Sequence, residues 1–281
     1  MKHLVWKQWL SALIAGVCAV LLVQGCAYTK PRCNYKAVAT IEPLRYFTNQ
    51  IGGNRWEVST MVPRGFSPEE FMPTVKQMAE LAEACCVVKA GNLGFETTAL
   101  ADATRQVKGL YVCNTSRGIK VAPFDPHTWT SPSNAKIICR NIAQMLIALD
   151  PAGAQGYKAR LAKMERTIDS LQAQLHRELA ELPSRSFVIM HPALSTFAAE
   201  FRLNQIAVEN EGKEPTPQDV KNLIRMAKAQ GVRVIFVQQE FSESTARVLA
   251  QETGARIVKI NPLAYDWCNQ LLYIAKTLKH E

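Results

Sequence analysis

The longest periodic segment of the chain, residues 156–182, limits what the rest can fold into. Its large apolar side chains recur every three or four residues, at Tyr157, Leu161, Met164, Ile168, Leu171, Leu175, Leu179 and Leu182. This spacing places them on one face of a single α-helix. Such a helix would be about 40 Å long, with Pro183 at its end. We predict a stiff helix that runs along two domains and opposes large domain closure.

The same pattern also suits a coiled-coil helix that joins two copies of the chain. A single helix beside two domains can instead bury its apolar face within one chain. Nothing else in the sequence indicates an oligomer, and we expect a monomer.

Short apolar runs alternate with helical patterns on both sides of this segment. Before it, strands are predicted at 37–41, 56–62, 85–89 and 110–113, with helices at 43–51, 74–84 and 95–107. After it, strands are predicted at 187–190, 206–208, 232–237 and 256–260, with helices at 217–229, 242–253 and 262–278. This alternation is typical of parallel sheets. The sequence predicts an α/β protein of two lobes, each with a mainly parallel sheet, joined by one long backbone helix. We place the lobes at 38–150 and 183–281 and the linking helix at 151–182.

The N-terminus has the features of an export signal. An uncharged, largely apolar run from Leu10 to Val23 follows two lysines, and it is shorter than the roughly 20 residues of a membrane-spanning helix. The run ends in Val23-Gln24-Gly25-Cys26, which resembles the lipobox of bacterial lipoproteins. We predict a signal peptide at 1–25, a lipid on Cys26 and a polar tether at 26–37. The protein would then be an exported, membrane-anchored lipoprotein, periplasmic or on the cell surface. An ordinary secretory signal with an incidental cysteine is the alternative.

Neither the net charge nor the cysteine spacing indicates a nucleic-acid-binding protein or a cysteine metal site. The formal net charge is +9, but the basic residues are scattered along predicted helices without a nucleic-acid-binding motif, so we expect no nucleic-acid partner. The cysteines after Cys26 include no CxxC pair, and adjacent Cys85 and Cys86 would point to opposite faces of a strand. An exported protein can hold a disulfide, but the spacing does not identify its partners.

Polar residues follow the predicted strands of both lobes where those strands end. Ligands of open α/β sheets bind beyond the carboxyl ends of the strands. Of the five histidines in the chain, His127 and His191 lie in such loops, one in each lobe and each beside a proline. A single histidine of this kind is often structural, but a matched pair in two lobes favours metal binding.

These loops resemble those of the cluster A-I, or zinc/manganese-type, periplasmic metal-binding proteins of bacterial ABC importers. The resemblance extends from about Val38 to Lys279. It is strongest at Ala39-Thr-Ile-Glu-Pro-Leu44, Ile51-Gly-Gly53, Asp125-Pro-His-Thr-Trp129, Glu211-Gly-Lys-Glu-Pro-Thr216, Val234-Ile-Phe-Val237 and Asn261-Pro-Leu263. The family has two parallel α/β lobes joined by a long helix. The resemblance implies a substrate-binding protein, not an enzyme, that captures a divalent transition metal between its lobes. It would deliver the metal to an ABC permease with its ATPase.

The resemblance also implies four metal ligands, one from each of four loops. His127 occupies the second ligand position, in the Asp-Pro-His-x-Trp motif, and His191 occupies the third. Glu69 stands at the first position, where the family usually has His, and Asn261 stands at the fourth, where it usually has Asp. The expected set of Glu69, His127, His191 and Asn261 keeps the formal charge of three His and one Asp. Two imidazoles and one carboxylate suit zinc, and also manganese or ferrous iron, with Asn261 or a water in the last place.

Zinc is favoured as the cargo because manganese sites prefer more oxygen ligands. The segment 114–124 lacks the His- and Asp-rich loop that many zinc importers of this type carry, which removes one argument for zinc. If the ligand positions are shifted, the substitutes are Glu70, Gln238, Gln239 and Glu240.

Two other functions stay open. The altered positions Glu69 and Asn261 also fit a surface lipoprotein with the same fold and a degenerate metal site, which would serve adhesion or bind another ligand. A metal-dependent hydrolase is the second alternative, because two His and a carboxylate can activate water, but only Glu70 and Glu240 would be available as acid or base. Capture predicts tight metal binding that weakens at acid pH as the histidines gain protons.

Overall fold

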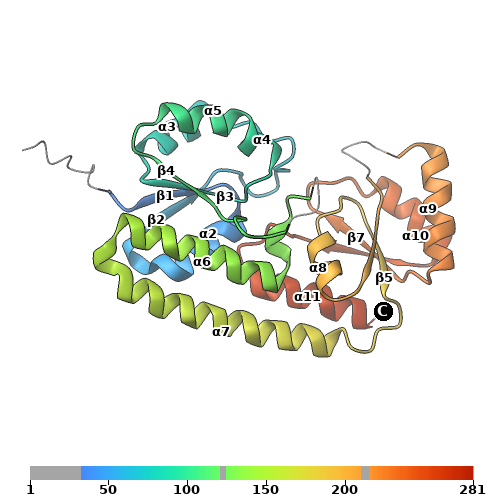
Figure 1. The fold of residues 1–281 in the computed structure, drawn as a ribbon. Helices are drawn as coiled ribbons and strands as arrows, with labels where there is room; N and C mark the ends of the chain where they lie inside the picture. Colours follow the sequence, from blue (N-terminus) through green and yellow to red (C-terminus); the bar gives the residue numbers. More distant parts are fainter. Residues whose placement is uncertain (1–32, 121–124, 210–214, 281) are drawn as a thin grey trace, which may run out of the picture. The chain divides into compact units, whose positions relative to one another are not determined.

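Two parallel four-stranded sheets with the same strand order form the fold (Figure 1). The N-terminal sheet has the order β2-β1-β3-β4, from β1 (Lys36–Ala39), β2 (Glu57–Thr60), β3 (Cys86–Lys89) and β4 (Tyr111–Asn114). The C-terminal sheet has the order β6-β5-β7-β8, from β5 (Ser186–Ile189), β6 (Asn204–Ala207), β7 (Val234–Gln238) and β8 (Arg256–Ile260). Each predicted strand is present, and the two-lobed α/β class is confirmed.

The computed structural model describes residues 33–120, 125–209 and 215–280. The predicted signal peptide, Cys26 and the first part of the tether lie outside these residues, as does most of the stretch from Glu211 to Thr216. Strand β1 begins at Lys36, inside the segment predicted as tether. Within the described residues, every helix is too short or too polar to cross a membrane.

Helices cover both faces of each sheet. In the N-terminal lobe they are α2 (Glu42–Gly52), α3 (Val75–Glu83), α4 (Gly94–Thr97), α5 (Ala99–Gln106) and α6 (Pro132–Leu149), with the 3₁₀ turns η1 (Gly53–Arg55), η2 (Thr128–Thr130) and η3 (Pro151–Gly153). In the C-terminal lobe they are α8 (Ser195–Glu200), α9 (Pro217–Ala229), α10 (Ser244–Thr253) and α11 (Trp267–His280). Capping boxes at Thr74 and Thr216 start α3 and α9.

Two helical predictions need correction, and two helices were not predicted. The helix predicted at 95–107 is two helices that meet at Thr98, whose backbone has left the helical region. The last helix begins at Trp267 rather than at 262, because the preceding residues form turns closed by the backbone bonds of Ala264 and Trp267. Helices α6 and α8 were not predicted.

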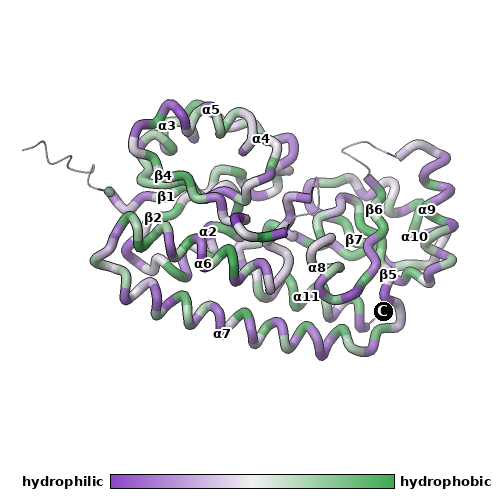
Figure 2. The backbone as a smooth tube through the Cα atoms, viewed as in Figure 1, coloured by the Kyte–Doolittle hydropathy of each residue, from purple (hydrophilic) through white to green (hydrophobic). Residues whose placement is uncertain are grey.

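Helix α7 (Ala154–Glu178) is the predicted long helix, with 25 residues. Figure 2 shows hydrophobic and hydrophilic residues alternating along it, and its buried side chains face α2, α6 and α11. The apolar face is therefore buried within the chain, which disfavours the coiled-coil alternative. The helix ends before 182, because the carbonyl of Leu179 accepts a hydrogen bond from the Arg185 side chain instead of from a helical amide.

One hydrophobic core extends through the N-terminal lobe and one face of the C-terminal sheet. Along β5, Phe187 and Ile189 belong to this shared core, whereas Val188 packs in a separate core with residues of α9 and α10. This alternation follows from the two-residue repeat of a strand. The lobes therefore share apolar packing and are not two independent bodies.

Two buried indoles bond the lobes together. Trp129 Nε1 donates to the carbonyl of Pro262 at 2.9 Å, and Trp267 Nε1 donates to the carbonyl of Trp129 at 2.7 Å. In addition, Thr196 Oγ1 donates to the carbonyl of His127 at 2.8 Å. The loop that carries His127 is thus held by residues of the C-terminal lobe.

Cys33 and Cys85 form a disulfide. The spacing of the cysteines alone does not identify this pair. The bond attaches the segment before β1 to the residue that precedes β3. Cys86, Cys113 and Cys139 are buried free thiols, as expected for cysteines that serve as small apolar side chains.

Replacing Ile168 tests whether α7 is held by its apolar face. The side chain is fully buried, so Ile168→Ala should lower the free energy of unfolding by about 2–5 kcal/mol. The matched change on the exposed face, Ser170→Ala, should alter it by less than about 0.5 kcal/mol. Urea unfolding followed by circular dichroism measures both free energies. Equal effects of the two substitutions would show that the apolar face does not hold α7 in place.

Candidate metal centre

Glu69 lies in the loop between β2 and α3, at the carboxyl end of the N-terminal sheet. Ser67 holds this side chain: its hydroxyl donates to Glu69 Oε2 at 2.6 Å and accepts from the Glu69 amide at 3.3 Å. The remaining oxygen, Oε1, points toward the histidines. The Glu69 side chain is 32% exposed, so it forms the rim of the site.

His127 precedes η2 and is almost completely buried. The Asp125 carboxylate accepts from both the His127 amide, at 3.0 Å, and the ring Nδ1, at 2.8 Å. The Asp-Pro-His sequence thus builds a turn whose own carboxylate orients the imidazole. With Nδ1 as the donor, Nε2 is the atom presented to the pocket.

His191 follows β5 directly and is held from three sides. Its Nδ1 donates to Glu209 Oε2 at 3.0 Å. The Gln238 side chain accepts from the His191 amide at 3.3 Å and donates to its carbonyl at 2.5 Å. The Phe241 ring stacks on the imidazole, with centroids 5.3 Å apart and planes inclined by 10°. As in His127, a carboxylate at Nδ1 leaves Nε2 free to face the pocket.

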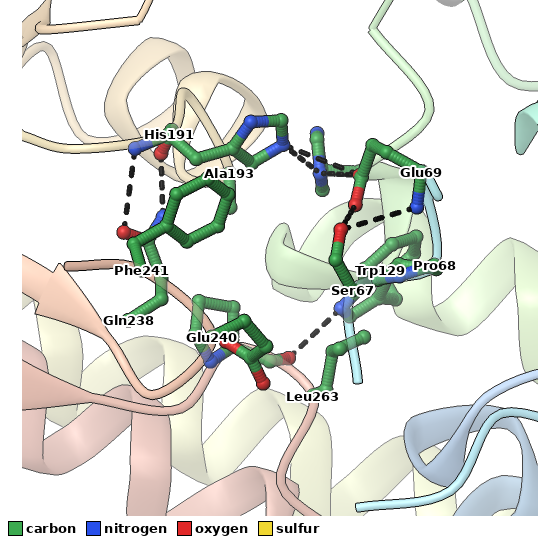
Figure 3. Close-up of a pocket in the computed structure, with 12 residues that line it drawn as sticks. Ser67, Pro68, Glu69, Trp129, His191, Ala193, Gln238, Glu240, Phe241 and Leu263 are labelled. Carbon is green, nitrogen blue, oxygen red and sulfur yellow. Dashed lines mark hydrogen bonds and ion pairs between the residues drawn. The ribbon is translucent and has the colours of Figure 1, made fainter. Parts of the chain in front are cut away.

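The three side chains converge on one point, although they come from two lobes. Figure 3 shows Glu69 and His191 pointing toward each other across the pocket. Glu69 Oε1 lies 3.3 Å from His127 Nε2 and 3.2 Å from His191 Nε2. The two Nε2 atoms are 3.2 Å apart. Among the described His, Cys, Asp and Glu residues, Glu69, His127 and His191 form a group whose ligand atoms all lie within 4.8 Å of one another. We call this group the three-residue cluster. Its two imidazoles and one carboxylate are a donor set that suits zinc.

The charges in the cluster explain how two Nε2 atoms can lie so close together. Burial lowers the pKa of His127, but hydrogen bonds to Asp125 and Glu69 outweigh this and raise it to about 9. For Glu69, burial raises the pKa, but hydrogen bonds and charge from both histidines hold it well below its usual range. At neutral pH these shifts favour a protonated His127 beside an ionised Glu69. A metal that binds here has to replace this proton.

Asn261 lies beside the cluster rather than in it. It lines an adjoining cavity with Glu240, Glu42 and Arg64, whereas the pocket of the cluster is lined by Glu240 but not by Asn261. Its Oδ1 accepts from the Leu263 amide at 3.0 Å. The fourth expected ligand is thus engaged in a turn in this structure.

The sequence did not single out the residues that orient the histidines. Asp125 stands out in the sequence only as part of a motif, and the predicted ligand set includes neither Glu209 nor Phe241. Glu209 follows β6 at the carboxyl edge of the sheet, so the same rule that identified His191 applies to it. Gln238 was considered as a substitute ligand, but its amide holds the backbone of His191.

Comparison with known proteins places these features in a family. Residues 37–279 match the family "Zinc-uptake complex component A periplasmic". A "Putative metal-binding protein" of Treponema pallidum is 28% identical over 296 residues, covering 96% of this chain and 92% of that protein. The "Zinc-binding lipoprotein AdcA" of Streptococcus pneumoniae strain R6 is 24% identical over 276 residues, covering 90% of this chain and 55% of AdcA. The chain thus spans about half the length of its AdcA relatives.

Solved structures agree with this relationship. A structure described as "Crystal structure of ZnuA" superposes with a TM-score of 0.84 at 33% identity and covers 87% of this chain and 98% of that one. At 24% identity, the laminin-binding protein Lmb of Streptococcus agalactiae has the same fold, with a TM-score of 0.79 over 87% of this chain and 100% of Lmb. Because the family match extends over nearly all of the described residues, this chain belongs to the ZnuA family of periplasmic zinc-uptake components.

Proposed function

We propose that this protein is the substrate-binding component of a bacterial metal-ion ABC importer. It captures a divalent transition metal at the three-residue cluster and passes it to a permease with its ATPase. The observation that carries the proposal is the convergence of Glu69, His127 and His191 within 3.2–3.3 Å, with a carboxylate on the Nδ1 of each histidine. Carboxylates at that position are the usual partners of metal-binding histidines. Capture needs no bond to be made or broken in the cargo, so no catalytic group is required.

Zinc is the favoured cargo, with manganese and ferrous iron as the alternatives. Two imidazole nitrogens are softer ligands than the oxygens that manganese prefers. The match to a zinc-uptake family and the zinc-binding name of the AdcA relatives support the same choice. A manganese-bound structure of the same fold, at 22% identity, comes from Candidatus Liberibacter asiaticus, so the fold alone does not select the metal.

The N-terminal sequence supports a lipid anchor at Cys26, which would hold the monomeric protein on a membrane next to its permease. AdcA of Streptococcus pneumoniae is named a lipoprotein. The alternative of a degenerate site in a surface adhesin is supported by the name of Lmb, a bifunctional protein with adhesin and metal transporting activity. The ordered histidines of this chain support metal capture over a degenerate site.

Metal loading tests the proposal directly. Residues 27–281, stripped of metal and offered equimolar zinc, manganese and ferrous iron, should retain one equivalent of a single metal, with zinc expected. A His127→Ala/His191→Ala variant should retain none, because both imidazoles are lost. Metal content by mass spectrometry is the measurement. An unloaded wild-type protein would favour the degenerate site.

The carboxylate behind His191 should matter without touching the metal. Glu209→Gln keeps the size of the side chain but removes its charge, so zinc affinity should fall by about 10–100-fold. Glu252→Gln, a change to an exposed carboxylate of α10, is the matched control. Chelator competition measures the zinc affinity of each variant. Equal affinities for the two variants would contradict the orienting role of Glu209.

Zinc affinity should depend on pH through His127. Because its pKa is raised to about 9, metal binding below that pH releases a proton, and affinity should rise about tenfold per pH unit from 7 to 9 and level off above. Asp125→Asn removes the negative charge from the hydrogen-bond partner that contributes most to raising this pKa, so the levelling point should move to lower pH. A response that is flat over this range would rule out displacement of a proton from His127.

A further inference from the structure

A second acidic side chain, Glu240, lines the pocket of the three-residue cluster. It follows β7, next to the point where the strand order of the C-terminal sheet reverses between β5 and β7. Ligands of open α/β sheets bind at such points. Glu240 lines both the pocket of the cluster and the adjoining cavity at Asn261, so it lies between the observed cluster and the fourth expected ligand.

Two contacts hold the Glu240 segment against His191. Gln238 is bonded to the backbone of His191, and Phe241 is stacked on its ring. Since Glu240 lies between them in sequence, its backbone is fixed beside an imidazole of the cluster. Figure 3 shows Glu240 and Phe241 on one side of the pocket and Glu69 and Ser67 on the other.

The other oxygen-bearing side chains around the pocket are already engaged. Asp125 and Glu209 accept from the Nδ1 atoms, Gln238 binds backbone, Ser67 binds Glu69, and Asn261 accepts from the Leu263 amide. Glu240 differs from all of them. Within the described part of the chain its carboxylate has no ion pair and no side-chain hydrogen bond, and its own backbone amide is its partner.

We propose that Glu240, rather than Asn261, supplies the fourth metal ligand. The inference rests on the metal-binding function proposed above. Zinc in proteins usually takes four ligands, and the cluster supplies three. The Glu240 carboxylate lies outside the group of atoms within 4.8 Å, so coordination requires its side chain to turn toward them. A cation between Glu69 and Glu240 also removes the repulsion between these two carboxylates.

This assignment changes the chemistry of the site. The ligand set becomes two imidazoles and two carboxylates, with one more negative charge than the set that includes Asn261. Oxygen ligands favour hard cations, so Glu240 contributes relatively more to manganese affinity than to zinc affinity. A carboxylate that acted only through its charge would strengthen the binding of both divalent cations equally.

The test compares zinc and manganese affinities, by chelator competition, for residues 27–281, which include the compact unit 33–281. Glu240→Gln should lower the zinc affinity by at least about tenfold and the manganese affinity by more. Asn261→Ala should change the zinc affinity by less than about threefold. Glu252→Gln, a change to an exposed carboxylate of α10, is the matched control and should leave both affinities unchanged. Melting of the metal-stripped proteins verifies that each variant is folded, and Glu240→Ala provides a second variant at the same position.

The outcomes separate this inference from the function itself. Wild-type protein that binds neither metal would overturn the proposed function. Wild-type protein that binds metal as tightly as Glu240→Gln and Glu240→Ala would overturn only the role of Glu240. Equal weakening of zinc and manganese would also overturn it, because Glu240 would then act through its charge. A loss of affinity confined to Asn261→Ala would assign the fourth position to Asn261.

Discussion

The three-residue cluster depends on the hydrogen bonds that hold the His127 loop to the opposite lobe. The carbonyls of His127 and Trp129 accept from Thr196 and Trp267, and the Trp129 indole donates to the carbonyl of Pro262. These groups are buried, so leaving any of them unpaired would cost about 1–3 kcal/mol. His127 therefore belongs to the N-terminal lobe by sequence but to the C-terminal lobe by contacts. This packing sets the position of His127, whose Nε2 lies 3.2 Å from that of His191.

The packing brings donor atoms close together, and their repulsion has to be compensated. Hydrogen bonds to Asp125 and Glu69 raise the pKa of His127, which favours a protonated ring beside the Glu69 carboxylate and the second imidazole. The Asp125 carboxylate behind the ring stabilises the same proton and, once the proton leaves, still orients the imidazole. If the protein captures metal as proposed, the cation has to displace this proton, and its affinity therefore depends on pH.

The sequence predicted the fold better than it predicted the site, for identifiable reasons. The strands and α7 have clear periodicities, and the carboxyl-end rule located His127 and His191. Helix α6 was missed although Ser131 and Pro132 form a recognisable start, with the Ser131 hydroxyl accepting from the Asn134 amide. The break at Thr98 has no such signal. The sequence also does not specify turn geometry, which decides whether a loop side chain faces the pocket or accepts from a nearby backbone amide. Asn261 accepts from the Leu263 amide, and Glu240 lines the pocket.

Asn261 illustrates how one position can lose a charge and keep a structural role. The related family usually has Asp here, and both side chains offer the same oxygen to an amide two residues later. In this chain the oxygen accepts from Leu263, which shapes the turn around Pro262. The carbonyl of Pro262 in turn receives the Trp129 indole, and Trp129 lies two residues from His127. An Asn at 261 can therefore preserve the support of the His127 loop without providing an anion. The negative charge that the family places at this position must then come from elsewhere in the pocket, and Glu69 and Glu240 are the carboxylates that line it.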